Sequence, residues 1–420
     1  MHIGVLSDPD SFHTQKWVTA LQQAGAKVTV FSFSQSRIPG IACVHIPPSY
    51  AINGKWTYAS FLYSGDLLRH ELTRHGVDII QAINVTPYGV WGARSGFRPL
   101  INMAMGADIL EYPPTLEESV IPMSRFWSSA DTEANLGILS KGIHQLKWRI
   151  FRGRVQEALN ASDLIMGDNI RLLTAMKDWF SVPAHKLSLN RWGVDESLFE
   201  ANATELRHLK ERFGVRPWQK LVLSARGLKP VYQADIILDA FEMLIKRGVR
   251  DLKFVMLASN YEIPPSIEKK AQFLESHFPN FTMIRELLPR HTVCQLWRIT
   301  DAFINIPAYD GFSNALCEGR YAGAIPIVND IPAHREVIKH NHNGWIVDPL
   351  TPHHLADGIL NVMEQGDALK AKFGKANREW TLKHAHLHTN IEAFLHEAEQ
   401  VLRRYRKNHS PKSKSYHHSR

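Results

Sequence analysis

The sequence predicts an α/β protein with two Rossmann-like lobes, each built on a parallel sheet. Runs of strand length rich in Val, Ile, Leu and Phe alternate with segments of helical periodicity along the chain, a pattern typical of parallel sheets covered by helices on both faces. The polar, charged stretch 202–216 divides the alternation into two series. A chain of 420 residues is long enough for two or three domains. We therefore expect two lobes that face each other across a cleft, where the carboxyl ends of their strands bind ligands.

The first series begins with a strand directly after Met1. The first helix is predicted over His13–Ala24, where Trp17, Val18 and Leu21 share one face and Gly25 ends the helix. The expected strands of this lobe are His2–Leu6, Lys27–Phe33, Ile79–Ala82, Leu100–Met105, Leu164–Gly167 and Lys186–Leu189.

One segment of the first lobe, 141–154, is basic with interleaved aromatic residues. Two interpretations are open: the segment is a helix that lies on an anionic bilayer, or it is a solvated helix whose apolar residues belong to the core. We favour the second because it is more common. The apolar positions assigned to the core are Ile143, Leu146, Ile150 and Val155.

The second series follows the polar stretch and ends in a long helical pattern over 377–404. Its expected strands are Leu221–Ser224, Phe254–Leu257, Met283–Leu287, Ala302–Ile306, Ile325–Val328 and Trp345–Val347. The resulting domain assignment is a first lobe over 1–195, a second lobe over 196–385, a C-terminal helix over 386–405 and a basic, disordered tail over 406–420.

The distribution of charge and the number of cysteines argue against several classes of protein. The net charge is +8, but the residues from Arg403 onward include seven basic and no acidic side chains, so the rest of the chain is nearly neutral. This distribution argues against a nucleic-acid-binding face. Cys43, Cys294 and Cys317 are too few and too far apart for a disulfide framework or a structural zinc site.

We expect no secretory leader, because the features of a signal peptide do not follow Met1, and no transmembrane helix, because the sequence contains no apolar run of about 18 residues. We therefore expect a cytoplasmic protein, and leave open peripheral contact at the inner face of the membrane through its basic segments.

The turn after the first strand, 7–13, carries neither a GxGxxG nor a Walker motif. A dinucleotide-dependent dehydrogenase or a P-loop kinase is therefore disfavoured. His13 lies where this strand gives way to a helix, so it either reaches the cleft or is merely exposed in an N-terminal capping turn.

The most informative stretch follows the strand near 303–306. Gly311 and Ser313 place a turn just ahead of a helix, whose free N–H groups and positive dipole end favour a phosphate. Asp310 precedes that helix and Glu318 lies about one and a half turns into it. One carboxylate could hold a diol, or both could be unrelated surface acids. We expect the Glu318 side chain to face the cleft and therefore to contribute little to the core.

A cationic pair follows the strand 221–224. Arg226 and Lys229 are placed at a carboxyl edge of the same lobe, where they could neutralise a diphosphate without a metal ion. The alternative is that both are solvated loop residues.

A set of motifs resembles family 4 of the retaining glycosyltransferases, and the resemblance implies the GT-B architecture. In the second lobe the set comprises 224–230 with Tyr232 and Ala240-Phe241, 309–318, 322–328, Glu336 and 343–349. In the first lobe and at the boundary it comprises 12–14 with Trp17, Leu21 and Gly25, then 106–110 and 192–195.

The resemblance implies roles for the candidate residues. Asp310 would be directed at the hydroxyls of the donor sugar and Glu318 at the ribose of a nucleoside diphosphate. Arg226 and Lys229 would hold the diphosphate. Further donors to the diphosphate would come from the backbone of Gly311, Phe312 and Ser313.

Several positions depart from the family pattern. Asp310 stands where the family usually has Glu, Tyr232 stands where a Lys-Gly pair is common, and residues 8–11 replace a glycine-rich loop. Met105 precedes the 106–110 motif at a position where related enzymes can carry His.

Two residues of the first lobe, Asp108 and His13, are the candidates for a base that acts on the acceptor.

The function implied is a metal-independent, retaining hexosyltransferase that uses a nucleotide sugar, first of all a UDP-sugar. Its acceptor would be a glycan or a lipid-linked glycan, as in cell-surface polysaccharide biosynthesis, and it would need no cofactor. Two alternatives remain: a nucleotide-sugar 2-epimerase on the same fold, or a non-catalytic glycan- or membrane-binding protein.

Overall fold

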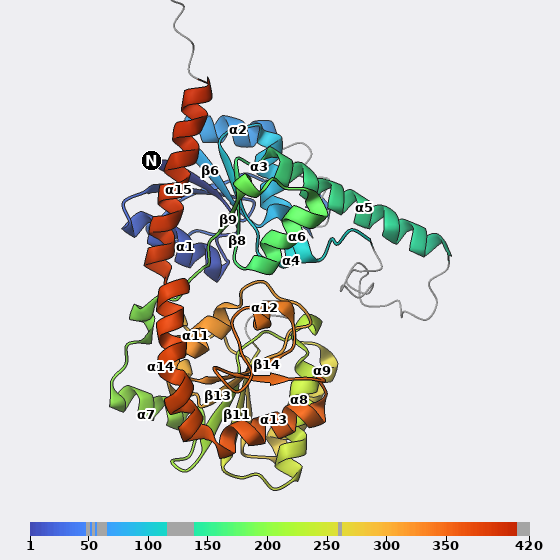
Figure 1. Ribbon diagram of the computed structural model, residues 1–420, viewed down its shortest axis with the longest axis vertical. Helices are drawn as coiled ribbons and strands as arrows, with labels where there is room; N and C mark the ends of the chain where they lie inside the picture. The colour runs from blue at the N-terminus through green and yellow to red at the C-terminus, as the bar shows by residue number, and fades with distance from the viewer. Residues whose placement is uncertain (48–50, 53–54, 57–64, 116–137, 259–262, 410–420) are drawn as a thin grey trace, which may run out of the picture. The chain divides into compact units, whose positions relative to one another are not determined.

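The computed structural model describes residues 1–47, 51–52, 55–56, 65–115, 138–258 and 263–409. These residues form two compact units (Figure 1). The first contains 1–168, 172–190 and the chain from His388 onward, and the second contains 169–171 and 191–387. The chain therefore passes into the second unit near Arg191 and returns to the first at His388.

The first unit is built on a seven-stranded, fully parallel sheet with the strand order β3-β2-β1-β6-β7-β8-β9. Its strands are β1 His2–Leu6, β2 Lys27–Ser32, β3 Ala42–His45, β6 Ile79–Ile83, β7 Leu100–Met103, β8 Leu164–Gly167 and β9 Leu187–Leu189. The edge strand β3 and a short antiparallel pair, β4 Ala51–Ile52 with β5 Lys55–Trp56, are additions to the predicted set.

The helices of the first unit alternate with these strands along the chain, except α15, which returns from the second unit. They are α1 Phe12–Gln23, α2 Gly65–Arg74, α3 Val90–Ser95, α4 Ala107–Leu110, α5 Ile138–Ala161, α6 Ile170–Phe180, of which 170–171 are grouped with the second unit, and α15 Leu387–His409. Trp17 and Leu21 of α1 are buried as predicted. The helix ends next to Gly25, whose φ of 87° suits a residue without a Cβ.

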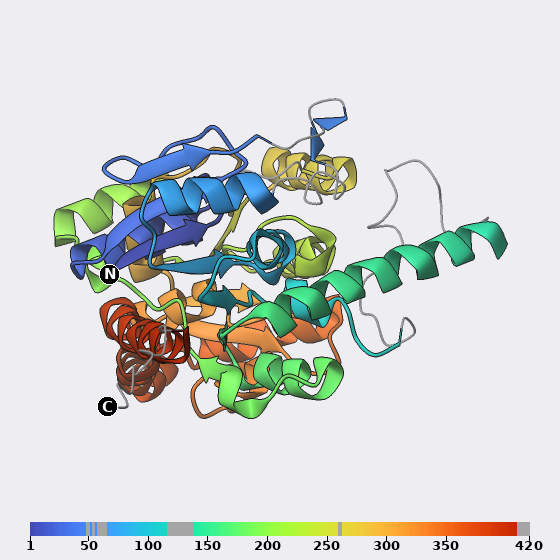
Figure 2. The ribbon, with the colours of Figure 1, turned by 90° about the horizontal axis from the view of Figure 1, so that it is seen from above.

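The core role assigned to the apolar residues of α5 is wrong for two of them. Leu146 is 58% exposed and Ile150 is 46% exposed, whereas Val155 is buried. The physical reason is visible in Figures 1 and 2, in which the N-terminal part of α5 extends beyond the rest of the first unit. The side chain of Ile143 lies outside the described residues.

The second unit is built on a six-stranded parallel sheet with the order β12-β11-β10-β13-β14-β15. Its strands are β10 Lys220–Ser224, β11 Leu252–Leu257, β12 Phe281–Ile284, β13 Ala302–Asn305, β14 Ile325–Asn329 and β15 Trp345–Val347. The strand expected over 283–287 begins and ends earlier, because Phe281 and Met283 are buried while Leu287 is 66% exposed.

Eight α-helices are described for the second unit's main segment. They are α7 Ala203–Arg212, α8 Ala234–Lys246, α9 Pro265–His277, α10 Arg290–Ile299, α11 Asn314–Ala322, α12 Pro332–Arg335, α13 Pro352–Glu364 and α14 Gly366–His384. Phe241 of α8 and Leu355 of α13 share a core cluster with strand residues such as Phe254 and Ile304.

The helical pattern over 377–404 is interrupted between α14 and α15, and α15 begins at Leu387, one residue from the predicted start of the C-terminal helix at 386. The amide of Val194 donates to the carbonyl of Ala385 (2.7 Å), and the amide of Leu387 donates to the carbonyl of Val194 (2.9 Å). These bonds replace helical hydrogen bonds at the break. Gly193 makes the approach possible, since a Cβ there would lie 2.5 Å from the nitrogen of Leu387.

Helix α15 continues to His409, beyond the predicted end at 405. Arg406, which was assigned to the disordered tail, is held by an ion pair with Asp78 (2.6 Å). The remainder of the tail, 410–420, lies outside the described residues. No described helix is both long and apolar enough to cross a membrane.

Candidate functional site

The candidate donor site lies at the carboxyl edge of the second sheet. The neighbouring strands β10, β13 and β14 end at Ser224, Asn305 and Asn329. Since all three are parallel, the loops that follow them meet at one edge. These loops carry Arg226, the segment 306–313 and the segment 330–336.

Arg226 and Asp310 are in direct contact, although they are 84 positions apart in the sequence. The guanidinium of Arg226 lies 3.1 Å from a carboxylate oxygen of Asp310 and donates to the Ser313 hydroxyl at 2.7 Å. It also lies over the Tyr232 ring, 4.4 Å from its centroid. Burial alone would lower the pKa of Arg226, but Asp310 and Tyr232 outweigh it and raise this pKa. A fixed positive charge therefore stands beside the start of α11.

The start of α11 is a turn followed by a capped helix, as the sequence predicts. Ser313 is the N-cap residue, and its side-chain oxygen accepts a hydrogen bond from the amide of Leu316 (3.3 Å). Gly311, Phe312 and Ser313 are all buried. The nine-residue helix directs its N-terminal amides toward the side where Arg226 contacts Ser313.

Glu318 lies deeper than expected. Its side chain is 5% exposed, one carboxylate oxygen pairs with Arg290, and the other accepts a hydrogen bond from the Trp297 indole at 3.2 Å. Both partners come from α10. The expectation that Glu318 contributes little to the core is therefore wrong. The carboxylate is held in one orientation by two donors and keeps further acceptor capacity.

Lys229 lies three positions beyond Arg226 in the loop between β10 and α8. It is exposed, and its carbonyl accepts a hydrogen bond from the amide of Tyr232 (2.8 Å). The loop therefore presents a half-buried cation, Arg226, and an exposed cation, Lys229, at the same sheet edge.

A buried polar network behind Asp310 was missed by the sequence analysis. His334 is buried and its Nδ1 donates to the carbonyl of Asn329 (2.9 Å), so its Nε2 is the acceptor for the Asn305 amide (3.1 Å). The side chain of Asn329 donates in turn to the carbonyl of Pro307 (2.7 Å). Burial lowers the pKa of His334 and so favours its neutral form. The signal in the sequence for this network was the Asn at the end of each of two apolar strands, Asn305 in β13 and Asn329 in β14.

A second network joins the Phe312 loop to Arg191. The Arg191 guanidinium lies 4.7 Å from the centroid of Phe312 and 5.6 Å from that of Trp380. Arg191 also forms an ion pair with Glu336 (2.6 Å). Glu336 therefore holds the Arg191 guanidinium in place over the ring of Phe312, the residue next to Ser313.

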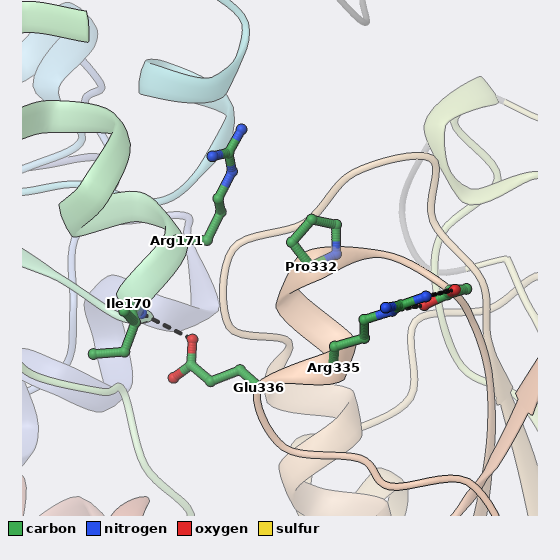
Figure 3. Close-up of a pocket in the computed structure, with 6 residues that line it drawn as sticks. Ile170, Arg171, Pro332, Arg335 and Glu336 are labelled. Atoms are coloured by element: carbon green, nitrogen blue, oxygen red, sulfur yellow. Dashed lines mark hydrogen bonds and ion pairs between the residues drawn. The ribbon is translucent and has the colours of Figure 1, made fainter. Parts of the chain in front are cut away.

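Glu336 also borders a cavity of about 660 Å³, shown in Figure 3. It accepts a hydrogen bond from the amide of Ile170 (2.8 Å), and Arg335 pairs with Asp330. The six lining residues all belong to the second unit: Ile170, Arg171, Asp330, Pro332, Arg335 and Glu336. Two of these side chains are cationic and two are anionic.

The two candidate bases, Asp108 and His13, lie in the first unit. Asp108 is buried, and its two oxygens accept hydrogen bonds from the amides of Val85 (2.7 Å) and Met105 (2.9 Å). Burial raises the pKa of Asp108 to about 6. His13 is half-buried in the first turn of α1, next to Phe12. Asp108 thus holds two backbone segments together.

Within the described residues, no cluster of three His, Cys, Asp or Glu side chains suits a metal ion.

Two family models match the sequence. The model described as glycosyl transferases group 1 matches residues 207–380, and the model described as glycosyl transferase 4-like matches residues 2–132. No curated protein matches the sequence significantly.

Solved structures similar to this chain cover nearly all of it. Sucrose-phosphate synthase from Thermosynechococcus elongatus has a TM-score of 0.76 and 12% identity, covering 96% of this chain and 100% of its own. HepE from Anabaena, in complex with UDP and glucose, has a TM-score of 0.71 and 16% identity, and the match covers 95% of this chain and 100% of the HepE chain. A glycosyltransferase from Rickettsia africae has a TM-score of 0.69 and 15% identity, and the match covers 96% of this chain and 98% of the chain from Rickettsia africae.

Proposed function

Since the chain belongs to the group 1 glycosyltransferases of family 4, which have the GT-B fold, we propose that it transfers a hexosyl unit from a UDP-sugar with retention of configuration. The acceptor is a glycan or a lipid-linked glycan in cell-surface polysaccharide biosynthesis. The observation that carries this proposal is the contact of Arg226 with both Asp310 and the N-cap Ser313 of α11. Similar structures hold UDP or UDP-glucose, which supports UDP as the donor nucleotide.

The residues at the sheet edge suit a diphosphate leaving group. Arg226, Lys229 and the N-terminal amides of α11 would meet the negative charge that develops on the diphosphate as its bond to the sugar breaks. Diphosphate oxygens would compete with Asp310 for Arg226. The carboxylate of Asp310 would then be available to hydroxyls of the donor sugar, while Glu318 accepts hydrogen bonds from the ribose.

A base that acts on the acceptor remains part of the proposal. Asp108 and His13 are both proposed as candidates, and both oxygens of Asp108 already bind backbone amides. The proposed location is the cytoplasm, with peripheral contact at the inner face of the membrane, and no nucleic acid is bound.

The alternative enzyme, a nucleotide-sugar 2-epimerase, would need a histidine as well as carboxylates on the sugar. His334 is the histidine whose charge environment includes Asp310, but each of its ring nitrogens already has a partner. This arrangement favours transfer over epimerisation. A non-catalytic binding protein would have no need for the paired Arg226 and Asp310.

We expect transfer to continue in the presence of EDTA, because Arg226, Lys229 and the α11 amides supply the positive charge that a metal ion would otherwise supply. The measurement is a product assay with UDP-sugar and acceptor, with EDTA and with added Mg²⁺. A large loss of rate that Mg²⁺ restores would contradict metal independence. The same assay without acceptor separates the alternatives, since an epimerase converts the donor alone.

A further inference from the structure

Helix α5 has one face in the core and another in solvent. Trp148, Val155 and Leu159 are buried, whereas Leu146 and Ile150 are 58% and 46% exposed. The two exposed residues are four positions apart, so their side chains are neighbours on the helix surface. They are among the most exposed large apolar residues of the described chain. Scattered apolar residues on a surface need no explanation, but two adjacent ones on a protruding helix do.

The charge around this apolar pair has one sign. From Ile138 to Gln156 the helix contains five basic residues and no acidic residue. Arg149, one position before Ile150 and three after Leu146, is exposed. Arg152 instead turns inward, where it donates to the carbonyls of Tyr112 (2.7 Å) and Trp179. The helix is therefore anchored through Arg152 and presents Leu146, Arg149 and Ile150 outward.

We propose that this outward face, formed by Leu146, Arg149 and Ile150, docks on the surface of an anionic bilayer. Aliphatic side chains can enter the boundary between headgroups and acyl chains while an adjacent guanidinium stays among the phosphates. The absence of acidic residues from 138–156 removes the repulsion that an anionic surface would otherwise meet. Docking would bring the first unit to the surface that holds a lipid-linked acceptor. This docking gives the proposed peripheral membrane contact a defined surface, and its use for a lipid-linked acceptor rests on the proposed function.

The experiment is vesicle co-sedimentation of the full chain with phosphatidylcholine vesicles and with mixed phosphatidylcholine–phosphatidylglycerol vesicles, at low and physiological salt. The wild type is expected to bind the mixed vesicles preferentially. The variant Leu146→Ser/Ile150→Ser is expected to bind them about tenfold more weakly at both salt concentrations, since the loss is apolar. Arg149→Gln is expected to lose about fivefold, mainly at low salt.

A matched control is available on α2. Leu67 is 45% exposed and Arg69 is exposed, so Leu67→Ser and Arg69→Gln remove similar side chains from another helix of the same unit. Both controls are expected to bind like the wild type. Transfer to a soluble acceptor should be unchanged in all these variants, which keeps this test separate from that of the proposed function.

Three results would overturn the proposal. The first is equal binding of the wild type and Leu146→Ser/Ile150→Ser to the mixed vesicles. The second is loss of binding when only the tail from Asn408 onward is deleted, which would assign the affinity to the tail. The third is absence of vesicle binding together with a dimer that Leu146→Ser/Ile150→Ser converts to a monomer, which would make the face a contact between two copies of the chain.

Discussion

Replacing Arg226 by Met is expected to lower kcat/KM for glycosyl transfer by roughly 10²- to 10³-fold, the usual cost of removing one preorganised donor to a developing anion. Arg226 contacts Asp310, Ser313 and Tyr232 together, so its loss removes a cation and also releases the side chains that surround the start of α11. Arg226→Lys should restore part of the charge but not the simultaneous contacts. Steady-state kinetics with varied UDP-sugar measure the effect.

Arg212→Met is the control for this variant. Arg212 also belongs to the second unit and forms an ion pair with Glu286 (2.7 Å), but both side chains are largely exposed, and such pairs contribute little to stability. Its kinetics should match those of the wild type. Near-normal transfer by Arg226→Met would remove this residue from the donor site.

Glu318→Gln is expected to raise the KM for the UDP-sugar by roughly 10- to 100-fold, because charge-assisted hydrogen bonds to a carboxylate contribute about 1.5–3 kcal/mol. The amide can still accept from Trp297, but it no longer pairs with Arg290 as an anion. We therefore also expect a lower melting temperature. Kinetics and thermal unfolding of the same preparation measure both effects.

Arg290→Gln separates the two roles of Glu318. This variant removes the ion pair while the carboxylate remains, so its melting temperature should fall and its KM should rise less than that of Glu318→Gln. If Glu318→Gln keeps a normal KM while its melting temperature falls, Glu318 is only a structural residue.

Most of the strands and the donor-site edge were open to prediction from the sequence because they depend on local patterns, whereas the order of the strands in each sheet was not predicted. Apolar runs locate the strands, and a residue that follows a parallel strand lies at a known edge. This reasoning placed Arg226 and Asp310 in the same lobe at the same edge, and the structure brings them into contact. The family and the GT-B fold are likewise confirmed by the family models and the similar structures.

What could not be predicted depends on contacts between distant segments. Periodicity shows that Leu146 and Ile150 share a face of α5, but it does not show whether anything covers that face. The break after α14 is made by the backbone of Val194, nearly two hundred positions earlier. The burial of Glu318 depends on Arg290 and Trp297 from another helix. Each of these outcomes is set by the tertiary partner and not by local propensity.

Thermal unfolding of the wild type and Arg226→Met with and without UDP, in EDTA, tests the central claim most directly. A ligand at 100 times its Kd stabilises a protein by about 2.7 kcal/mol, which is a measurable rise in melting temperature. The account predicts that UDP raises the melting temperature of the wild type and has little effect on Arg226→Met. If no nucleoside diphosphate stabilises the wild type, or if UDP stabilises both proteins equally, the donor site assigned to the carboxyl edge of the second sheet is wrong.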